Sequence, residues 1–191
     1  MVPTLLVAAF LSGAGLAADG KVTGTVTAAV AKNLVNTIVY VKAGDKGAVT
    51  PRTVTMDQVG LMFTPRVLPI QQGWTVTFTN SDPVGHSVFT SDVDAYDLGT
   101  WPKGESRSHT FTKTGVYRQL CKVHDDMIAY IVVVDTARFA LSDKAGAFTL
   151  EGLPAGDYTL GVWNEKLISP DLPVHVEAGK STTVSIPLGA K

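Results

Sequence analysis

The pattern of apolar and polar positions along the chain predicts many short β-strands and no long helix. In Trp74–Asn80 (WTVTFTN) the two kinds of residue alternate strictly, which is typical of a strand with one buried face. Similar segments predict further strands at Lys21–Thr27, Thr37–Lys42, Thr53–Met56, Gln58–Phe63, Arg66–Ile70, His86–Thr90, Ser106–Phe111, Gly115–Leu120, Ile128–Val134, Ala147–Leu150, Tyr158–Trp163, Val174–Val176 and Thr182–Leu188. The stretch Ala28–Val35 fits a short helix or a loop, and Ser91–Trp101 is predicted to be a connection. Consecutive apolar residues in Ile131–Val134 indicate a central strand buried on both faces.

The composition favours an all-β protein. Val and Thr, both β-branched, account for 25 and 22 of the 191 residues, and 18 Gly and 10 Pro supply turn residues. Charged residues make up 17% of the chain, and the formal net charge is −1. Because nucleic-acid recognition needs a basic excess, we expect no nucleic-acid partner.

The first eighteen residues have the pattern of a secretory signal peptide. An uncharged apolar run, Val2–Leu11, precedes the small residues of Ser12–Ala18, which is typical of a leader cleaved near its end. The run is too short to span a bilayer. No Lys or Arg precedes it, and the alternatives are an uncleaved anchor or a misread start site. We expect residues 1–18 to be removed and the mature chain to be periplasmic or otherwise exported, without a transmembrane segment.

Metal-binding residue types gather in one predicted loop, Cys121–Met127 (CKVHDDM), between two predicted strands. Cys121 is the one cysteine of the chain, so it either packs as a small buried hydrophobic residue or binds a metal as a thiolate. His124 and Met127 follow it at intervals of three, and His86 stands at the end of another predicted strand. Two His and one Cys with a weak axial Met form the ligand set of a blue copper site, so the expected cofactor is one copper ion cycling between Cu(I) and Cu(II).

Residues Thr53–Asp135 resemble a small cupredoxin, on the plastocyanin, amicyanin and pseudoazurin side of that family. The Cys-x2-His-x2-Met loop has the length found in amicyanin. Three further motifs support the resemblance: Phe63-Thr64-Pro65, Gly73-x2-Val76-x-Phe78-x-Asn80 and Gly115-x-Tyr117-x3-Cys121. The resemblance implies an eight-stranded Greek-key β-sandwich with the copper ligands His86, Cys121, His124 and Met127.

The same resemblance implies where electrons leave the site. His124 should expose its ring edge through an apolar patch, where a redox protein such as a cytochrome or a periplasmic oxidoreductase docks. Asp125 and Asp126 either bias that rim towards a cationic partner or are ordinary solvated carboxylates.

Two positions depart from the family pattern. Ser87 follows His86 where many relatives carry an Asn that braces the ligand loop, and a Ser side chain reaches less far. Gly85 precedes His86 in place of the Pro of plastocyanin-like members. Because Gly permits close backbone approach, the Gly85 carbonyl could lie near the ion opposite Met127.

The rest of the chain resembles a second β-sandwich family. The pattern Asp143-x2-Gly146-x-Phe148-x-Leu150-x2-Leu153-Pro154-x-Gly156-x-Tyr158-x-Leu160 is similar to the carboxypeptidase regulatory-like, or transthyretin-like, module. Such modules usually begin with a strand pair like that of Lys21–Val41. We therefore expect a cupredoxin domain (49–135) inserted into a discontinuous prealbumin-like or immunoglobulin-like sandwich (20–48 and 136–191). Alternatively, residues 20–48 pack on the cupredoxin domain as extra strands.

The expected function is transport of single electrons by a mononuclear copper protein that is not itself an enzyme. One Cys excludes a dinuclear centre, which needs two bridging thiolates, and Leu120 and Lys122 replace the His-Cys-His signature of multicopper oxidases. A copper carrier or buffer with the same ligands, and a metal-free structural or adhesive protein, are the alternatives.

Several other residues that could bind a ligand have ordinary structural explanations. His109 and His175 lie in strand patterns away from the loop and are interpreted as surface or edge histidines. Core packing and turn formation account for Trp163, Asn164 and Glu165 more simply than a binding surface does.

Overall fold

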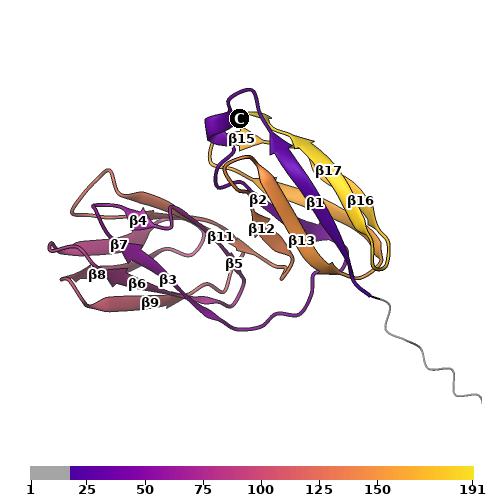
Figure 1. Cartoon of the computed structure of the whole chain (residues 1–191). Coiled ribbons are helices and arrows are strands. Elements are labelled where there is room, and N and C mark those ends of the chain that lie inside the picture. Colours follow the sequence, from indigo (N-terminus) through magenta and orange to yellow (C-terminus); the bar gives the residue numbers. More distant parts are fainter. Residues whose placement is uncertain (1–17) are drawn as a thin grey trace, which may run out of the picture.

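The chain folds into β-strands joined by turns, in a computed structural model that describes residues 18–191 (Figure 1). The predicted signal peptide, residues 1–18, lies outside the described residues except for Ala18. In the described part the one helix is a 3-10 turn, Ala31–Asn33 (η1), within the stretch for which a short helix or a loop was expected. Among these residues no helix is long and apolar enough to cross a membrane. The protein is all-β.

Residues 53–134 form one β-sandwich, called the central sandwich below. Its strands are β3 (Thr53–Gln58), β4 (Phe63–Thr64), β5 (Val67–Gln71), β6 (Thr75–Asn80), β7 (His86–Thr90), β8 (Tyr96–Trp101), β9 (Ser106–Thr110), β10 (Gly115–Leu120) and β11 (Ile128–Val134). One sheet has the order β4-β3-β6-β9 and the other β5-β11-β10-β7-β8. The neighbours β7 and β10 are antiparallel, with Leu120 opposite Phe89.

The core of the central sandwich holds two of the candidate ligands. Cys121 and Met127 are buried in one cluster with aromatic residues such as Phe78 and Tyr117. Alternate residues of β11, among them Ile131, enter the same cluster. Both sulfur atoms therefore belong to side chains that the core holds in place.

The remaining strands form a second sandwich, called the flanking sandwich below. They are β1 (Gly20–Thr27), β2 (Ile38–Ala43), β12 (Phe139–Leu141), β13 (Ala147–Leu153), β14 (Gly156–Trp163), β15 (Leu167–Ile168), β16 (Leu172–Val176), β17 (Ser181–Pro187) and β18 (Gly189–Ala190). Its main sheets have the orders β13-β1-β17 and β12-β2-β14-β16, and β15 pairs with β18. Strands β1 and β2 thus pair with strands that follow residue 138, although the central sandwich lies between them in the sequence.

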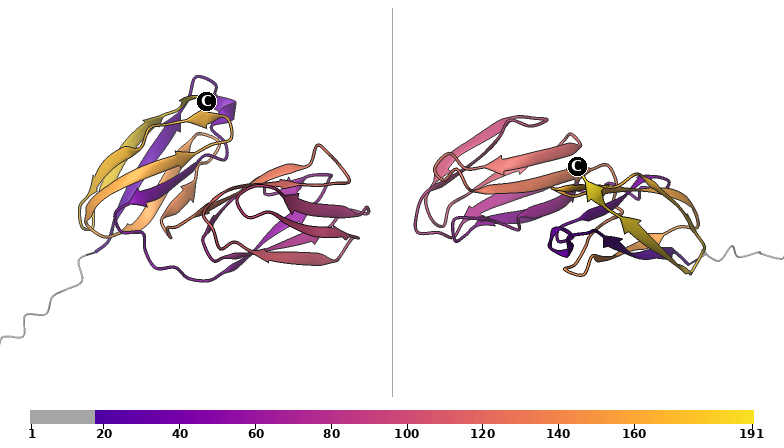
Figure 2. Two further views of the ribbon diagram at one scale, coloured as in Figure 1. Left: turned by 180° about the vertical axis from the view of Figure 1, so that it is seen from behind. Right: turned by 90° about the horizontal axis from the view of Figure 1, so that it is seen from above.

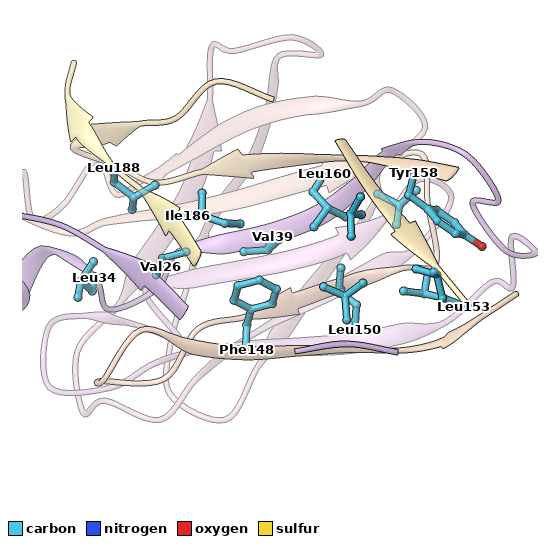
Figure 3. Close-up of a cluster of buried hydrophobic side chains, with 14 of the residues drawn as sticks. Val26, Leu34, Val39, Phe148, Leu150, Leu153, Tyr158, Leu160, Ile186 and Leu188 are labelled. Carbon is cyan, nitrogen blue, oxygen red and sulfur yellow. The ribbon is translucent and has the colours of Figure 1, made fainter. Parts of the chain in front are cut away.

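Figure 3 shows the apolar core of the flanking sandwich, in which side chains of its two main sheets meet. Val26, Phe148 and Ile186 come from the β13-β1-β17 sheet, and Val39 and Leu160 come from the other. This core is separate from the cluster that contains Cys121.

A third apolar cluster joins the two sandwiches, which lie next to each other in both views of Figure 2. Ile38 of β2 is fully buried and packs with Val67, Val132 and Val134 of the central sandwich. Strand β11 is therefore buried on both faces, as its consecutive apolar residues predicted: one face meets the central core and the other the flanking sandwich.

Two predicted segments were wrong. A single strand was expected over Gln58–Phe63, but β3 ends at Gln58 and the chain turns through Val59–Met62 before β4. Gly60 and Leu61 have positive φ angles of 65° and 57° in this turn, and two consecutive residues in the left-handed region interrupt the extended backbone of a strand. The connection expected at Ser91–Trp101 contains β8, which pairs with β7 and ends at the buried Trp101.

Candidate metal centre

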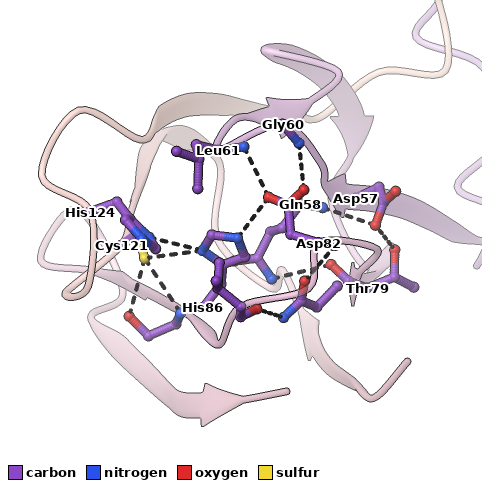
Figure 4. A network of polar contacts seen from close by, with 12 residues as sticks. Asp57, Gln58, Gly60, Leu61, Thr79, Asp82, His86, Cys121 and His124 are labelled. Carbon is purple, nitrogen blue, oxygen red and sulfur yellow. Dashed lines mark hydrogen bonds and ion pairs between the residues drawn. The ribbon is translucent and has the colours of Figure 1, made fainter. Parts of the chain in front are cut away.

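Three side chains that can bind a metal converge at one end of the central sandwich (Figure 4). His86 begins β7, Cys121 follows the last residue of β10, and His124 lies in the loop Cys121–Met127, called the ligand loop below. The Nδ1 atoms of His86 and His124 are 3.1 Å apart, and Cys121 Sγ is 4.0 Å from His86 Nδ1. Strand pairing brings these residues together, because β7 and β10 are antiparallel neighbours and the loop starts where β10 ends.

These spacings fit a shared metal ion. First-row ions bind imidazole nitrogen at about 2.0–2.1 Å and thiolate sulfur at about 2.3 Å, so donors sharing one ion lie roughly 3–4 Å apart. The three donor atoms all lie within 4.8 Å of one another. The residues are those of a type 1 copper site, for which a single copper ion is expected.

One ring nitrogen of His86 is left free to bind a metal. The Nε2–H group of His86 donates a hydrogen bond to Asp82 Oδ2, at 2.8 Å, and the ring is fully buried. A carboxylate accepts but does not donate, so the proton of the neutral ring belongs on Nε2 and the lone pair on Nδ1. It is Nδ1 that faces Cys121 and His124.

Asp82 also holds the turn between β3 and β4. The backbone N–H groups of Gly60 and Leu61 donate to its two carboxylate oxygens, at 2.7 and 2.9 Å. These two N–H groups and the bond from His86 hold the pKa of Asp82 below its usual value. One buried carboxylate thus fixes both a candidate ligand and the turn, as Figure 4 shows.

The Cys121 sulfur lies in an environment that favours a thiolate. Burial raises the pKa of its thiol, but the backbone N–H groups of Ser87, Val123 and His124 are directed at the sulfur. Together with His86 they lower the pKa to about 6. The N–H of Ser87 lies 3.5 Å from Sγ. A thiolate is the form of cysteine that binds metal.

Ser87 braces the ligand loop despite its short side chain. It is fully buried, and its hydroxyl accepts a hydrogen bond of 2.7 Å from the backbone N–H of Lys122. The same hydroxyl lies 3.8 Å from Cys121 Sγ. The short Ser87 side chain can therefore brace the ligand loop, because the loop backbone at Lys122 lies within hydrogen-bond distance of its hydroxyl.

The end of the ligand loop buries Met127 in the core that also holds Cys121. The N–H of Met127 donates to the His124 carbonyl, at 3.1 Å, which closes a tight turn. The Met127 side chain is 1% exposed and belongs to the same buried cluster as Cys121. His124 is half-buried and follows the exposed Val123, so its ring lies where the core meets the surface.

Asp82 is the residue of the site that sequence reasoning missed. It lies between the predicted strands Trp74–Asn80 and His86–Thr90, in a segment where only the Gly85 carbonyl was expected to lie near the ion. Its position four residues before His86 was the available signal, but a carboxylate in a loop is usually solvated, and its burial comes from the turn that closes over it.

The other two histidines stand apart from this cluster. His109 stacks on Tyr96, with ring centroids 3.9 Å apart, and His175 pairs with Asp157 on the surface of the flanking sandwich.

Comparison with known proteins agrees with the geometry. Residues 50–134 match the family of copper binding proteins described as the plastocyanin/azurin family. This segment is a cupredoxin domain, and it amounts to a little under half of the chain. The match does not include the flanking sandwich.

Solved structures with similar segments are cupredoxins and a larger copper enzyme. An oxidized variant of amicyanin is 26% identical, with a TM-score of 0.41, over 43% of this chain and 82% of that one. A purple cupredoxin from Nitrosopumilus maritimus is 25% identical, with a TM-score of 0.39, over 42% and 98%. The Cu-containing nitrite reductase from Thermus scotoductus SA-01 is 32% identical, with a TM-score of 0.42, over 49% and 25%. A search of curated proteins found no match.

Proposed function

We propose that this protein, whose cupredoxin domain carries a type 1 copper ligand set, transfers single electrons between redox partners and is not itself an enzyme. The observation that carries the proposal is the convergence of His86 Nδ1, His124 Nδ1 and Cys121 Sγ, with Asp82 holding the proton of His86 away from the site. We assign His86, Cys121 and His124 as equatorial ligands and Met127 as the weak axial ligand.

A bound copper ion would supply a one-electron change between Cu(I) and Cu(II). The protein's own part is to hold the ligands in nearly the same place in both states. Asp82 fixes the His86 ring, Ser87 fixes the start of the ligand loop, and the core encloses both sulfur atoms. Ligands fixed before electron transfer need little rearrangement during it.

The surface around His124 suits brief docking of a partner. Leu61, Met62, Val84 and Val123 are 43–61% exposed. The N–H of Leu61 donates to Asp82 and Met62 follows Leu61, while Val84 lies two residues before His86 and Val123 directly precedes His124. Asp125 and Asp126 are exposed on the ligand loop, directly after His124. An apolar area with acidic neighbours favours a redox protein with a basic rim.

The proposal also covers the location of the protein and the family of its flanking sandwich. The apolar leader pattern of residues 1–18 supports export, with the periplasm as the proposed location. The motif around Gly146–Leu160 supports a carboxypeptidase regulatory-like module for residues 20–48 and 136–191. The approach of the Gly85 carbonyl to the ion is likewise proposed.

Adding copper to the purified protein tests the ligand assignment. Cu(II) should produce the intense thiolate-to-copper band of a blue site, and Cys121→Ala should abolish it because the thiolate is the source of the band. His175→Ala, which removes an exposed histidine of the flanking sandwich, is the matched control and should remain blue. A colourless wild-type protein would overturn the proposal.

Stopped-flow oxidation of the reduced protein by a cytochrome separates an electron carrier from a copper carrier. Fast exchange is expected for ligands fixed in advance. Slow exchange together with tight Cu(I) binding would instead show a copper carrier or buffer with the same ligands.

A further inference from the structure

A turn of the flanking sandwich presents a carboxylate towards the metal-binding end of the central sandwich. Asn164, which follows β14, is 3% exposed and anchors this turn. Its amide Nδ2 donates to the Asn33 carbonyl and to Thr37 Oγ1, at 2.9 and 2.7 Å. Its Oδ1 accepts from the N–H groups of Lys166 and Leu167. The next residue, Glu165, is therefore held in a defined place.

Glu165 reaches across to Arg66 of the central sandwich. Arg66 Nη2 donates to Glu165 Oε1 at 3.0 Å, and the Tyr130 hydroxyl donates to the same oxygen at 3.3 Å. The Arg66 guanidinium also lies over the Tyr130 ring, 5.8 Å from its centroid. One residue from each sandwich, Glu165 and Tyr130, thus contacts this guanidinium.

The second terminal nitrogen of the Arg66 guanidinium binds the backbone of Ile128, the residue that follows Met127. Arg66 Nη1 donates to the Ile128 carbonyl at 3.0 Å. Strand β5 pairs with β11 only from Tyr130 onward. The Arg66 side chain therefore continues beyond the ladder and holds the backbone where the ligand loop ends.

Apolar contacts near Glu165 fix the position of the two sandwiches relative to each other. Trp163, two residues before Glu165, packs on Tyr130 with ring centroids 5.4 Å apart. The buried cluster of Ile38, Val67 and Val132 lies alongside. The position of Glu165 relative to Arg66 is therefore set by a packed interface as well as by the ion pair.

We propose that the flanking sandwich is a support for the copper site, in which Glu165 acts through Arg66 to position Ile128 and, one peptide away, the axial residue Met127. The inference rests on the proposed function of that site and gives the flanking sandwich a part in it. Glu165 and Arg66 are positioning residues, since neither touches a ligand side chain.

The expected effect is on geometry more than on stability. Glu165 and Arg66 are 29% and 48% exposed, and ion pairs at such sites contribute little to the free energy of unfolding. Groups that hold metal ligands directly change metal affinity by about 10–100-fold, and this contact is one step further removed. We expect Glu165→Ala to raise the rate of copper loss to a chelator roughly threefold, below that range.

The test uses the full chain with Glu165→Ala, Arg66→Ala and the double variant. Each variant is loaded with copper and compared by visible and electron paramagnetic resonance spectra and by copper loss. Hydrogen exchange at the Ile128 and Tyr130 amides is measured in the metal-free protein. Asp171→Ala is the matched control, because it removes an exposed ion pair with Lys42 inside the flanking sandwich. Glu165→Gln keeps an acceptor for Arg66 and is the conservative variant.

Support for the inference is an altered spectrum, faster copper loss and faster amide exchange in Glu165→Ala, with Glu165→Gln and Asp171→Ala close to wild type. The double variant should equal Arg66→Ala, because Glu165 acts through Arg66. Two outcomes would overturn this inference alone, given a wild-type protein that turns blue with copper. In the first, the variants do not differ from the wild type. In the second, the variants unfold at lower temperature while their spectra and their rates of copper loss stay unchanged. A wild-type protein that stays colourless with copper would overturn the proposed function and this inference with it.

Discussion

At the scale of single residues, the site depends on which atoms carry protons. His86 can bind a metal through Nδ1 because a buried carboxylate accepts the proton on Nε2. Cys121 can bind as a thiolate because backbone N–H groups of Ser87 and its own loop stabilise the negative sulfur. Both candidate ligands are thus prepared for metal binding by neighbouring groups that are not themselves part of the ligand set.

Asp82→Asn should weaken copper binding by about tenfold or more, the range found for groups that orient a ligating histidine. The amide cannot accept from His86, Gly60 and Leu61 as the carboxylate does, so the His86 ring loses its fixed orientation. Competition with a chelator measures the affinity. Asp57→Asn is the control, since Asp57 bonds Thr79 in the same network without touching His86. Equal losses in both variants would contradict the role of Asp82.

In the metal-free protein the Cys121 thiol should titrate near pH 6. The folded-state pKa lies below the ordinary value of about 8.5, so the thiolate predominates above pH 6 and is lost as the pH falls through that value. Copper affinity should decline in the same direction, because protons compete for the sulfur. Ultraviolet thiolate absorbance measures the titration, with Cys121→Ala as the blank. A midpoint near 8.5 would show that the N–H groups have no effect.

At the scale of elements, the ligands lie at strand ends and in one short loop. His86 opens β7 and Cys121 follows β10, and these strands are hydrogen-bonded neighbours. The β3–β4 turn, Val59–Met62, closes over the same end through Asp82 and exposes Leu61 and Met62. Rigid strands therefore position the metal ligands, while turns form the surface that a partner would meet.

Leu61→Asn should slow electron self-exchange between reduced and oxidized protein several-fold while leaving the blue band unchanged. Asn tolerates the positive φ of this position and keeps the backbone N–H that bonds Asp82, so the variant removes only exposed apolar surface. Line broadening in nuclear magnetic resonance measures the exchange rate.

Val93→Asn is the matched control for Leu61. Val93 also has a positive φ, 46°, and is 53% exposed, but it follows the far end of β7 from His86. Its substitution should leave self-exchange unaltered. If both variants slow exchange equally, the turn at Val59–Met62 has no particular part in docking.

At the scale of the whole molecule, the two sandwiches share a buried boundary. Strand β11 contributes one face to the central core and the other to the contact with Ile38. The chain therefore buries apolar surface that a cupredoxin domain alone would expose, and the two halves should stabilise each other.

Ile38→Ala should lower the free energy of unfolding by about 2–5 kcal/mol, as for other large-to-small changes at fully buried sites. Ile38 is 0% exposed between the sandwiches, so the deletion leaves a cavity at their boundary. Ile168→Ala, at a residue 57% exposed on β15, should change the stability by less than about 0.5 kcal/mol. Denaturant unfolding of the full chain measures both. A small effect of Ile38→Ala would show that the boundary contributes little.

The sequence could predict His86, Cys121, His124 and Met127 as a candidate ligand set because each carries unusual chemistry, and the structure brings the first three together. Three of them stand at fixed spacing in one loop, and the alternating strands around them identify an all-β sandwich. Local pattern also predicted that β11 is buried on both faces. Such features depend on residue type and near neighbours, which the sequence shows directly.

Only the tertiary structure decided what surrounds the site. The turn at Val59–Met62 was predicted to be part of a continuous strand because its residues are apolar. Only the hydrogen bonds from its backbone to Asp82 show why the chain bends there. Asp82 and Glu165 look like solvated carboxylates in the sequence. Their partners are more than twenty residues away for the Asp82 turn contacts and 99 residues away for Arg66. Contacts between distant segments depend on how the strands pack, and no local pattern encodes them.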